Sequence, residues 1–343
     1  MKKLKKLALV ILTAGSFSFS SVVAGELSVT GGVTATYGMG EASSGLGVSN
    51  ELTFGAAGEL DNGFTWKYAM ELDNAAMNND DTALVLGTPY GNVGVFISEG
   101  GLSSKYAYGA GALAAGSDYS SPSDITWGAN IDSYNNVQYH TPAGLLPFGV
   151  TAKVGYAPNL SDVEGASAKN KGVVETAADG GSLTQYRIDA SPVEGLTVGA
   201  DYAKANDTLL VTKYAQESAS AYAKYAAGPV TIGFSRTGNQ PTKTTGATVT
   251  YETDAYGIKF AVNENLTISY GEEKSTKRTS STLAEAGAAR TAASEVDYEI
   301  EHIQAAYVIG GATVGIAIAD GKNVAYTAGR QDKQTIFSLA MAF

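Results

Sequence analysis

The feature that most constrains this chain is a two-residue period that returns along almost its whole length. From Phe64 to Leu72, large apolar side chains occupy every second position, and smaller or polar ones such as Lys67 stand between them. The same alternation is found at residues 27–37, 52–60, 150–156, 196–202, 230–235, 266–271 and 312–319. Because successive side chains of a strand point to opposite faces, each segment is predicted to be an amphipathic β-strand. A phase slip near Glu301 and His302 predicts a β-bulge.

Short and long connections take turns between these segments. The short ones carry hairpin-turn residues, as in Asp61-Asn62-Gly63 and Gly310-Gly311, whereas the long ones are polar. One end of the sheet therefore carries tight turns and the other carries loops. An even number of strands of this length, arranged in this way, is typical of an outer-membrane barrel, and the count here is about 16. We therefore predict an all-β fold, an antiparallel transmembrane β-barrel of about 16 strands.

The polar face of the strands separates this prediction from a soluble β-sandwich or β-solenoid, which would also alternate. That face is poor in charge and rich in Gly, Ala, Ser and Thr, as at Thr197 and Gly199. A face exposed to bulk water usually carries many Lys and Glu side chains. Small polar residues instead fit a roomy, wet interior.

The first 24 residues have the three parts of a secretory signal peptide. Four lysines precede an apolar run from Leu7 to Phe19, and Val22-Val23-Ala24 provides a small-residue cleavage site. The run is shorter than the roughly 20 residues that a membrane anchor needs. We predict a signal peptide at residues 1–24 and a barrel domain at residues 25–343.

Charge and composition exclude several classes of function. Removal of residues 1–24, which carry four lysines and no acid, lowers the formal net charge from −11 to −15, which disfavours nucleic acid as a partner. The absence of cysteine excludes thiolate metal sites and cysteine catalysis. The two histidines, His140 and His302, have no nucleophilic serine placed beside them by the sequence, so no enzyme activity and no catalytic residue are predicted.

The longest connection covers residues 99–133. It contains Tyr106, Tyr108, Leu113, Tyr119, Ile125 and Trp127. So many large side chains are unusual for a solvated tail, and loops of this length are usually functional.

The last segment, Asp332 to Phe343, again alternates and ends on an aromatic residue. Its outward positions would be Phe337, Leu339, Met341 and Phe343. Such a strand faces lipid, and we expect it to close the barrel beside residues 26–37.

Together, the signal peptide, the "GVTATYG" first strand, the Asp-Asn-Gly hairpin, the long third loop and the terminal Phe resemble a Gram-negative general diffusion porin. The likeness covers the whole mature chain and is greatest to the alphaproteobacterial, Rhodobacter-type branch. It implies a homotrimer in the outer membrane of a Gram-negative bacterium, surrounded by lipid and lipopolysaccharide. It also implies that the final strand, with Phe343, Met341, Leu339 and Phe337, is the signal that the barrel-assembly machinery binds.

The same resemblance implies that the third loop, residues 99–133, folds into the pore and forms a constriction. Its acidic half would be Glu99, Asp118 and Asp124, and the basic wall facing it would be Lys67, Lys153, Arg187 and Lys259. The chain departs from the family in having no dense arginine cluster on its strands.

The expected function is passive diffusion of small hydrophilic solutes and ions through a water-filled channel, with a mild cation preference. Two alternatives stay open: a substrate-selective channel with a binding site in the third loop, and a surface adhesin barrel without transport. No cofactor is expected, apart from a structural Ca²⁺ ion at Asp118 and Asp124, since carboxylate oxygens suit this cation.

Overall fold

The computed structural model describes residues 26–41, 44–73, 78–109, 125–160, 181–207, 215–241, 247–280 and 293–343. The predicted signal peptide, residues 1–24, lies outside this part of the chain. Among the described residues, no helix is long and apolar enough to cross a membrane.

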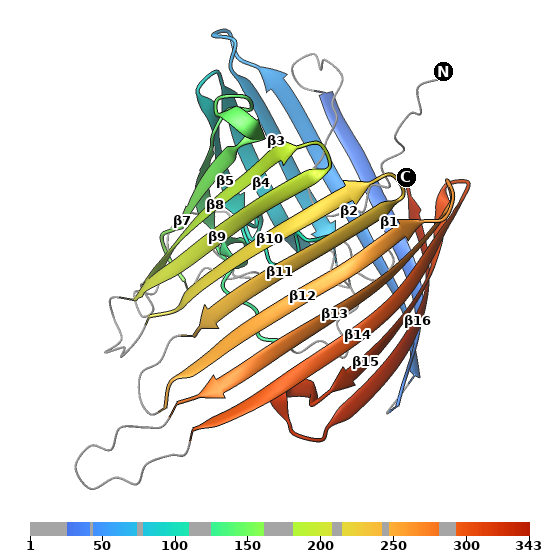
Figure 1. Ribbon diagram of the computed structural model, residues 1–343. Helices are drawn as coiled ribbons and strands as arrows, with labels where there is room; N and C mark the ends of the chain where they lie inside the picture. Colours follow the sequence, from blue (N-terminus) through green and yellow to red (C-terminus); the bar gives the residue numbers. More distant parts are fainter. Residues whose placement is uncertain are drawn as a thin grey trace, which may run out of the picture.

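The described residues form sixteen β-strands in one closed sheet (Figure 1). Every strand pairs antiparallel with its neighbours in the chain, and β1 completes the ring by pairing with β16. The strands are β1 (Glu26–Gly40), β2 (Ser44–Glu59), β3 (Thr65–Asp73), β4 (Asn78–Thr88), β5 (Gly91–Ile97), β6 (Asn136–His140), β7 (Thr151–Ala157), β8 (Gly181–Val193), β9 (Leu196–Asp207), β10 (Glu217–Ala227), β11 (Val230–Gln240), β12 (Val249–Ala261), β13 (Leu266–Thr279), β14 (Ser294–Ile309), β15 (Ala312–Lys322) and β16 (Gln331–Ala342). The predicted all-β, sixteen-stranded antiparallel barrel is confirmed.

The seam between β1 and β16 closes where the sequence predicts. Val33 lies opposite Met341, and the ladder extends to the last residue, because Gly31 and Phe343 exchange two backbone hydrogen bonds of 2.9 Å each. The four residues of the predicted assembly signal all have exposed side chains: Phe337, Leu339, Met341 and Phe343. Their recognition by an assembly machinery stays a prediction.

The two faces of the sheet differ as the alternation predicts. In β10, Ser218, Ser220 and Tyr222 are buried, while the alanines between them are exposed. The exposed face is the outside of the barrel. Aromatic side chains flank the apolar band of outer-membrane barrels. Six tyrosines have exposed side chains on this face: Tyr37, Tyr156, Tyr202, Tyr225, Tyr270 and Tyr307.

Two details of strand regularity differ from expectation. The bulge predicted near Glu301 and His302 is wrong, because β14 keeps an unbroken register with both β13 and β15 through these residues. Register shifts occur instead between Met70 and Leu72 and between Ala190 and Val193.

The connection from β6 to β7, residues 141–150, is longer than the other turns at its end of the barrel.

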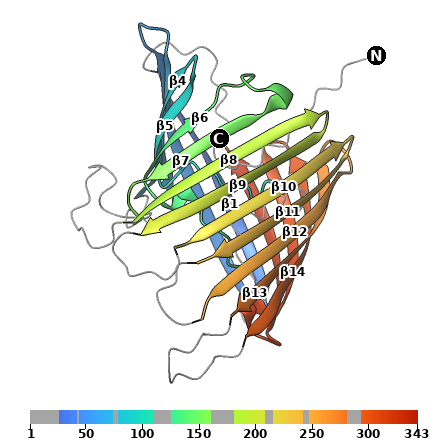
Figure 2. The same ribbon diagram turned by 60° about the vertical axis from the view of Figure 1, so that its left-hand side comes forward.

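The outer face of β11–β16 has two zones, and Figure 2 shows several of these strands from outside. The half nearer the tight turns is apolar, as at Ile258, Ile303 and Phe337. The half nearer the long loops is charged and paired across strands. Its pairs include Arg236–Asp254 at 2.5 Å, Lys274–Asp297 at 2.7 Å and Arg278–Glu295 at 3.0 Å.

The outer face of β1 and β2 lacks such a charged zone. It is apolar toward the turn end, at Leu27 and Val29, and stays apolar toward the loop end, at Leu46 and Val48. Leu46 is 85% exposed and Val48 is 69% exposed in the single chain. One sector of the barrel surface is therefore apolar along its length.

Candidate pore loop and its cavity

The third loop joins β5 to β6 and comprises residues 98–135. The structure describes an outgoing arm, residues 98–109, and a return arm, residues 125–135. Both arms hydrogen-bond to side chains on the inward-facing positions of the strands, as set out below. Both arms therefore lie against the inner wall of the barrel.

The first anchor of the outgoing arm is a buried carboxylate on β9. Asp201 Oδ1 accepts hydrogen bonds from the backbone N of Ser104 at 2.6 Å and from its Oγ at 2.7 Å. Gln185 Nε2 on β8 donates to Asp201 Oδ2 at 3.0 Å. Asp201 is 5% exposed, so these three donors compensate a charge that has lost its water.

A second anchor is Arg187 on β8. Its Nε and Nη2 atoms bind the two oxygens of Asp189 at 2.8 and 3.0 Å, and its Nη1 donates to the carbonyl of Ser103 at 3.0 Å. Tyr222 on β10 donates to Asp189 Oδ1 at 2.7 Å. The two bonds to Asp189 fix the orientation of the guanidinium group, and its Nη1 then holds the backbone of the loop at Ser103.

The arm then continues along the inner wall to the next strands of the ring. Ser235 Oγ on β11 donates to the carbonyl of Lys105 at 2.8 Å. Tyr108 packs in a cluster with Tyr222 and Ala255, and its hydroxyl donates to Glu273 Oε1 on β13 at 3.2 Å. The outgoing arm therefore contacts β8 to β13.

The return arm retraces part of this path. Thr126 N donates to the Tyr326 hydroxyl at 3.0 Å, Asn239 Nδ2 donates to the Trp127 carbonyl at 2.9 Å, and Ala129 N donates to Ser218 Oγ at 3.0 Å. Ile131 N donates to Gln185 Oε1 at 2.8 Å. Gln185 therefore binds both arms, one directly and the other through Asp201.

Apolar side chains of the loop fill hollows in the inner wall. Leu102 and Ile131 pack on a patch of β7–β9 made of Ala157, Leu183, Ala203 and Ala205. Ile125 packs with Tyr298, Ile300 and Val324 beside β14. These contacts explain why the inward face is locally apolar under the loop.

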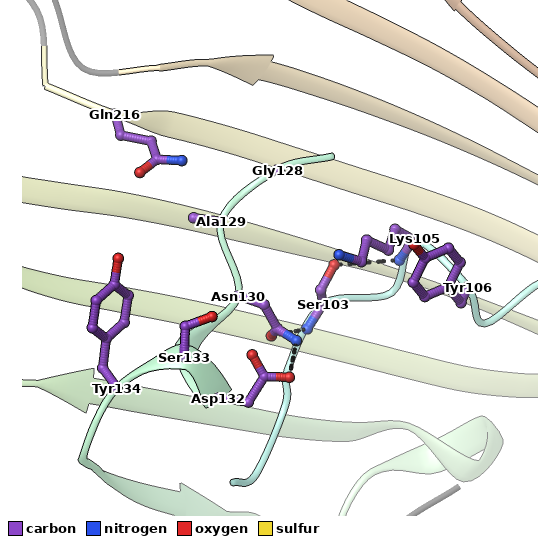
Figure 3. Close-up of a pocket in the computed structure, with 10 residues that line it drawn as sticks. All are labelled: Ser103, Lys105, Tyr106, Gly128, Ala129, Asn130, Asp132, Ser133, Tyr134 and Gln216. Carbon is purple, nitrogen blue, oxygen red and sulfur yellow. Dashed lines mark hydrogen bonds between the residues drawn. The ribbon is translucent and has the colours of Figure 1, made fainter. Parts of the chain in front are cut away.

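A cavity of about 400 Å³ lies between the two arms (Figure 3). Asn130 holds the arms together, since its Oδ1 accepts from the backbone N of Leu102 at 3.0 Å and of Ser103 at 2.9 Å. The lining is Ser103, Lys105, Tyr106, Gly128, Ala129, Asn130, Asp132, Ser133, Tyr134 and Gln216. Apart from two small residues and the tyrosine rings, this lining is polar.

The cavity holds one basic and one acidic side chain. Lys105 Nζ lies 4.9 Å from the ring centre of Tyr106 and 6.0 Å from that of Trp127, and no described carboxylate forms an ion pair with it. Burial lowers the pKa of Lys105, and the nearby Asp132 carboxylate opposes this change. Burial raises the pKa of Asp132, and Lys105 again opposes the change. Each charge therefore lies in the field of the other without direct contact.

The predicted site residues are distributed more widely than the resemblance implied. Glu99 lies at the start of the outgoing arm, where its Oε1 accepts from Gly100 N at 3.0 Å. Asp118 and Asp124, and with them the predicted Ca²⁺ site, lie outside the described residues. In the described ranges no group of three or more His, Cys, Asp or Glu residues that could hold a metal ion occurs.

Of the four predicted basic residues, the structure brings two together. Lys153 and Arg187 are cross-strand partners on the inner face of β7 and β8, with His140 next to Lys153 on β6. Lys259 and Lys67 occupy inward positions on β12 and β3, at other places on the ring. Arg187 is engaged with Asp189 and the loop, so its charge is compensated locally.

Sequence reasoning missed most of the loop contacts. Asp201, Glu273 and Gln185 were not selected, although each is a charged or long polar residue in the inward phase of a strand. That inward phase was the available signal. Lys105 and Asp132 were also missed, since nothing local distinguishes them from other loop residues.

The fold and the inward loop define a class: a sixteen-stranded barrel with its third loop against the inner wall. No family model matches the sequence, and no curated protein does either. Solved structures do. A porin refined at 1.8 Å is similar with a TM-score of 0.66 and 13% identity, over 93% of this chain and 100% of that one.

Two further structures show the same likeness. The anion-selective porin from Comamonas acidovorans has a TM-score of 0.63 and 14% identity, over 93% of this chain and 100% of its own. OmpT, an outer-membrane protein of Vibrio cholerae described in a trimer form, has a TM-score of 0.63 and 12% identity over the same shares. At such identity the likeness shows the porin fold and does not distinguish between branches. The fold agrees with the expected place in a Gram-negative outer membrane.

Proposed function

We propose that this protein is a passive diffusion channel of the outer membrane for small hydrophilic solutes and ions. The observation that supports this most is the barrel of sixteen strands, whose inward positions carry mostly small or polar side chains. Barrels of this strand number leave a lumen that side chains cannot fill. Passage through water requires no bond to be made or broken, so the proposal assigns no catalytic residue.

The third loop is proposed to narrow this channel. The support is its set of contacts with β8 to β13, which extend across a large part of the inner wall. Charged groups on the loop and on the wall would then determine which ions enter. Glu99 and Asp132 are the acids in the described part of the loop, and Lys67, Lys153, Lys224 and Lys259 lie at inward positions on the wall.

A mild cation preference is part of this proposal. The mature chain has an excess of negative charge, and Arg187, the only arginine of the predicted wall, is paired with Asp189. The anion-selective Comamonas porin has the same fold, so the fold alone does not determine the sign. The excess of negative charge on the mature chain supports the cationic sign.

The proposed partners are two more copies of the chain, lipid and lipopolysaccharide. A trimer is supported by the apolar sector at β1 and β2, which extends beyond the apolar zone of the other strands. The charged and paired outer zone of β11–β16 suits the polar headgroup region of the outer leaflet. The barrel-assembly machinery would bind the β16 residues during biogenesis.

Planar-bilayer conductance tests the proposal. Protein folded in detergent is added to one side under a salt gradient, and the step size and reversal potential are measured. Large steps in groups of three with a small cation-favouring potential are expected. A folded, heat-modifiable barrel that gives no steps would contradict the channel and favour an adhesin, and an anion-favouring potential would contradict the cation preference alone.

A further inference from the structure

We propose that the cavity between the two arms of the third loop is a binding site for a small zwitterionic solute, such as a free amino acid. The ammonium of Lys105 would bind the solute's carboxylate, and the carboxylate of Asp132 would bind its ammonium. This inference rests on the channel function, because it names a solute class that the channel would favour.

The first step is the state of Lys105. Its Nζ has three hydrogens to donate, lies over the faces of Tyr106 and Trp127, and forms no ion pair with a described carboxylate. A partly buried ammonium without an acceptor is costly, and a ligand oxygen would remove that cost. The amine is thus available for a ligand.

The second step is the position of Asp132. Its Oδ2 accepts from Asn130 Nδ2, the same side chain that ties the arms together. Asp132 and Lys105 line one cavity, and each is the leading charge that acts on the other. They form no ion pair with each other, so a dipolar molecule in the cavity that they both line could reach the two opposite charges.

The third step concerns size and lining. A cavity of about 400 Å³ is within the range of small-molecule sites and is ample for an amino acid. Ser133, Tyr134 and Gln216 provide hydroxyl and amide groups around it, and Tyr106, 54% exposed, provides an aromatic wall. These groups can hydrogen-bond the solute or contact its side chain.

The charge environment favours a zwitterion over a simple anion. Asp132, Asp201 and Glu273 all act on Lys105, so a free anion would bind the amine against three carboxylates. A simple cation would in turn meet Lys105 beside Asp132. A molecule with both charges gains from each without the corresponding repulsion.

The test uses Trp127 as a reporter, because it adjoins Lys105 and Tyr106. The chain has two tryptophans, and the other, Trp66, lies outside on β3, so the full-length Trp66→Phe protein reports from the loop alone. Its fluorescence is titrated with L-alanine, propionate, ethylamine and glucose. Saturable quenching or enhancement is expected with alanine alone, with a half-saturation on the order of millimolar, as suits a solute that must leave again.

In the same background, Lys105→Met and Asp132→Asn are each expected to weaken the alanine response at least about tenfold. Lys277→Met is the matched control, because Lys277 Nζ also lies over a ring, that of Tyr326 at 5.7 Å, yet is no part of the cavity lining. Folding of each variant is checked by heat-modifiable gel migration. If only one of Lys105→Met and Asp132→Asn folds, that variant alone tests the site.

Conductance of the same preparations separates the two proposals. An open channel with no alanine response overturns the zwitterion site and leaves the channel intact. An equal response to propionate or to glucose, or one that survives both substitutions, also overturns the site. An alanine response from a barrel that does not conduct supports the site and contradicts the channel.

Discussion

Gly31 is a glycine in the outward, otherwise apolar phase of β1, and its neighbours explain why. A Cβ placed on Gly31 would lie 2.7 Å from the Glu51 carbonyl oxygen and 2.9 Å from Phe343 Cε2. The ring of Phe343 therefore lies against β1 at an outward position that has no side chain. Gly32, the next residue, has its nearest such contact at 3.6 Å, the Met341 carbonyl oxygen.

Substitution at these adjacent glycines should therefore differ in effect. Gly31→Ala is expected to destabilise the barrel by roughly 1–3 kcal/mol, since backbone and a packed ring must move. Gly32→Ala is expected to cost less, because its Cβ fits at ordinary contact distance. Urea midpoints of detergent-folded protein, followed by gel migration, measure both, and equal midpoints would contradict the seam described here.

Asp201 is the residue whose loss should free the loop. Asp201→Ala leaves Ser104 N, Ser104 Oγ and Gln185 Nε2 without their acceptor, at a cost of about 1–3 kcal/mol for unsatisfied buried groups. The barrel strands should persist, whereas single-channel current should become noisier and the loop easier to cleave by protease.

The matched control is an acid outside the barrel. Asp320 lies on β15 with Lys333 Nζ at 3.8 Å, and its side chain is about half exposed. Such surface pairs contribute about 0–1 kcal/mol, so Asp320→Ala should leave current noise and cleavage unchanged. Equal noise in both variants would show that Asp201 does not hold the loop.

At the scale of the element, β14 changes its environment along its length while keeping its register. Toward the turn end, Ile303 and Tyr307 point outward as lipid-facing residues do. Toward the loop end, Glu299 and Glu301 point outward and pair with Lys274 and Lys322. The inward face changes the opposite way, because Tyr298 and Ile300 pack under the third loop.

This boundary predicts where a charge is tolerated. Ile303→Lys should destabilise the folded barrel in lipid vesicles by about 2–4 kcal/mol if Ile303 lies near the bilayer midplane. Thr250→Lys, at an outward position in the charged zone of β12, should change stability little. Guanidinium titrations in the same vesicles compare them, and similar losses at both positions would place the boundary elsewhere.

The same strand shows how far the sequence can be interpreted alone. Alternation identified most of the strands, because period two is a local property of backbone geometry, although it is less regular at residues 295–309. The turn-by-turn order of short and long connections indicated the antiparallel barrel. At Glu301 and His302 that logic failed, since the apparent phase slip is a change of surroundings on both faces and not a bulge. The inward hydrophobes there become explicable only once the loop that covers them is placed.

The loop contacts could not be predicted for a related reason. Ser104 and Asp201 are 97 residues apart, and their meeting depends on the barrel radius and on the path of the loop across the interior. No spacing in the sequence encodes that path. The resemblance placed the third loop inside and selected Arg187, but as a free wall charge and not as the anchor of Ser103.

At the scale of the whole molecule, the apolar sector at β1 and β2 predicts how copies associate. Leu46→Asp with Val48→Asp should convert the proposed trimer to monomers, since two charges would have to be buried without partners. Thr250→Asp, on the charged sector, should leave the trimer intact. Sedimentation in detergent or mild cross-linking measures the oligomer, and a trimer that survives the double change would assign its interface elsewhere.

The β1–β16 seam also has a consequence for how the chain reaches this structure. Gly32 pairs with Ala342, 310 positions further along the chain, whereas every other neighbouring pair of strands follows directly in sequence. Closing so large a loop carries a high entropic cost, and contacts of such separation form slowly. The hairpins can therefore form first, and the ring closes last. Until then the two unpaired edges are exposed and prone to aggregation, so the rate of closure, more than final stability, should limit the yield of folded protein.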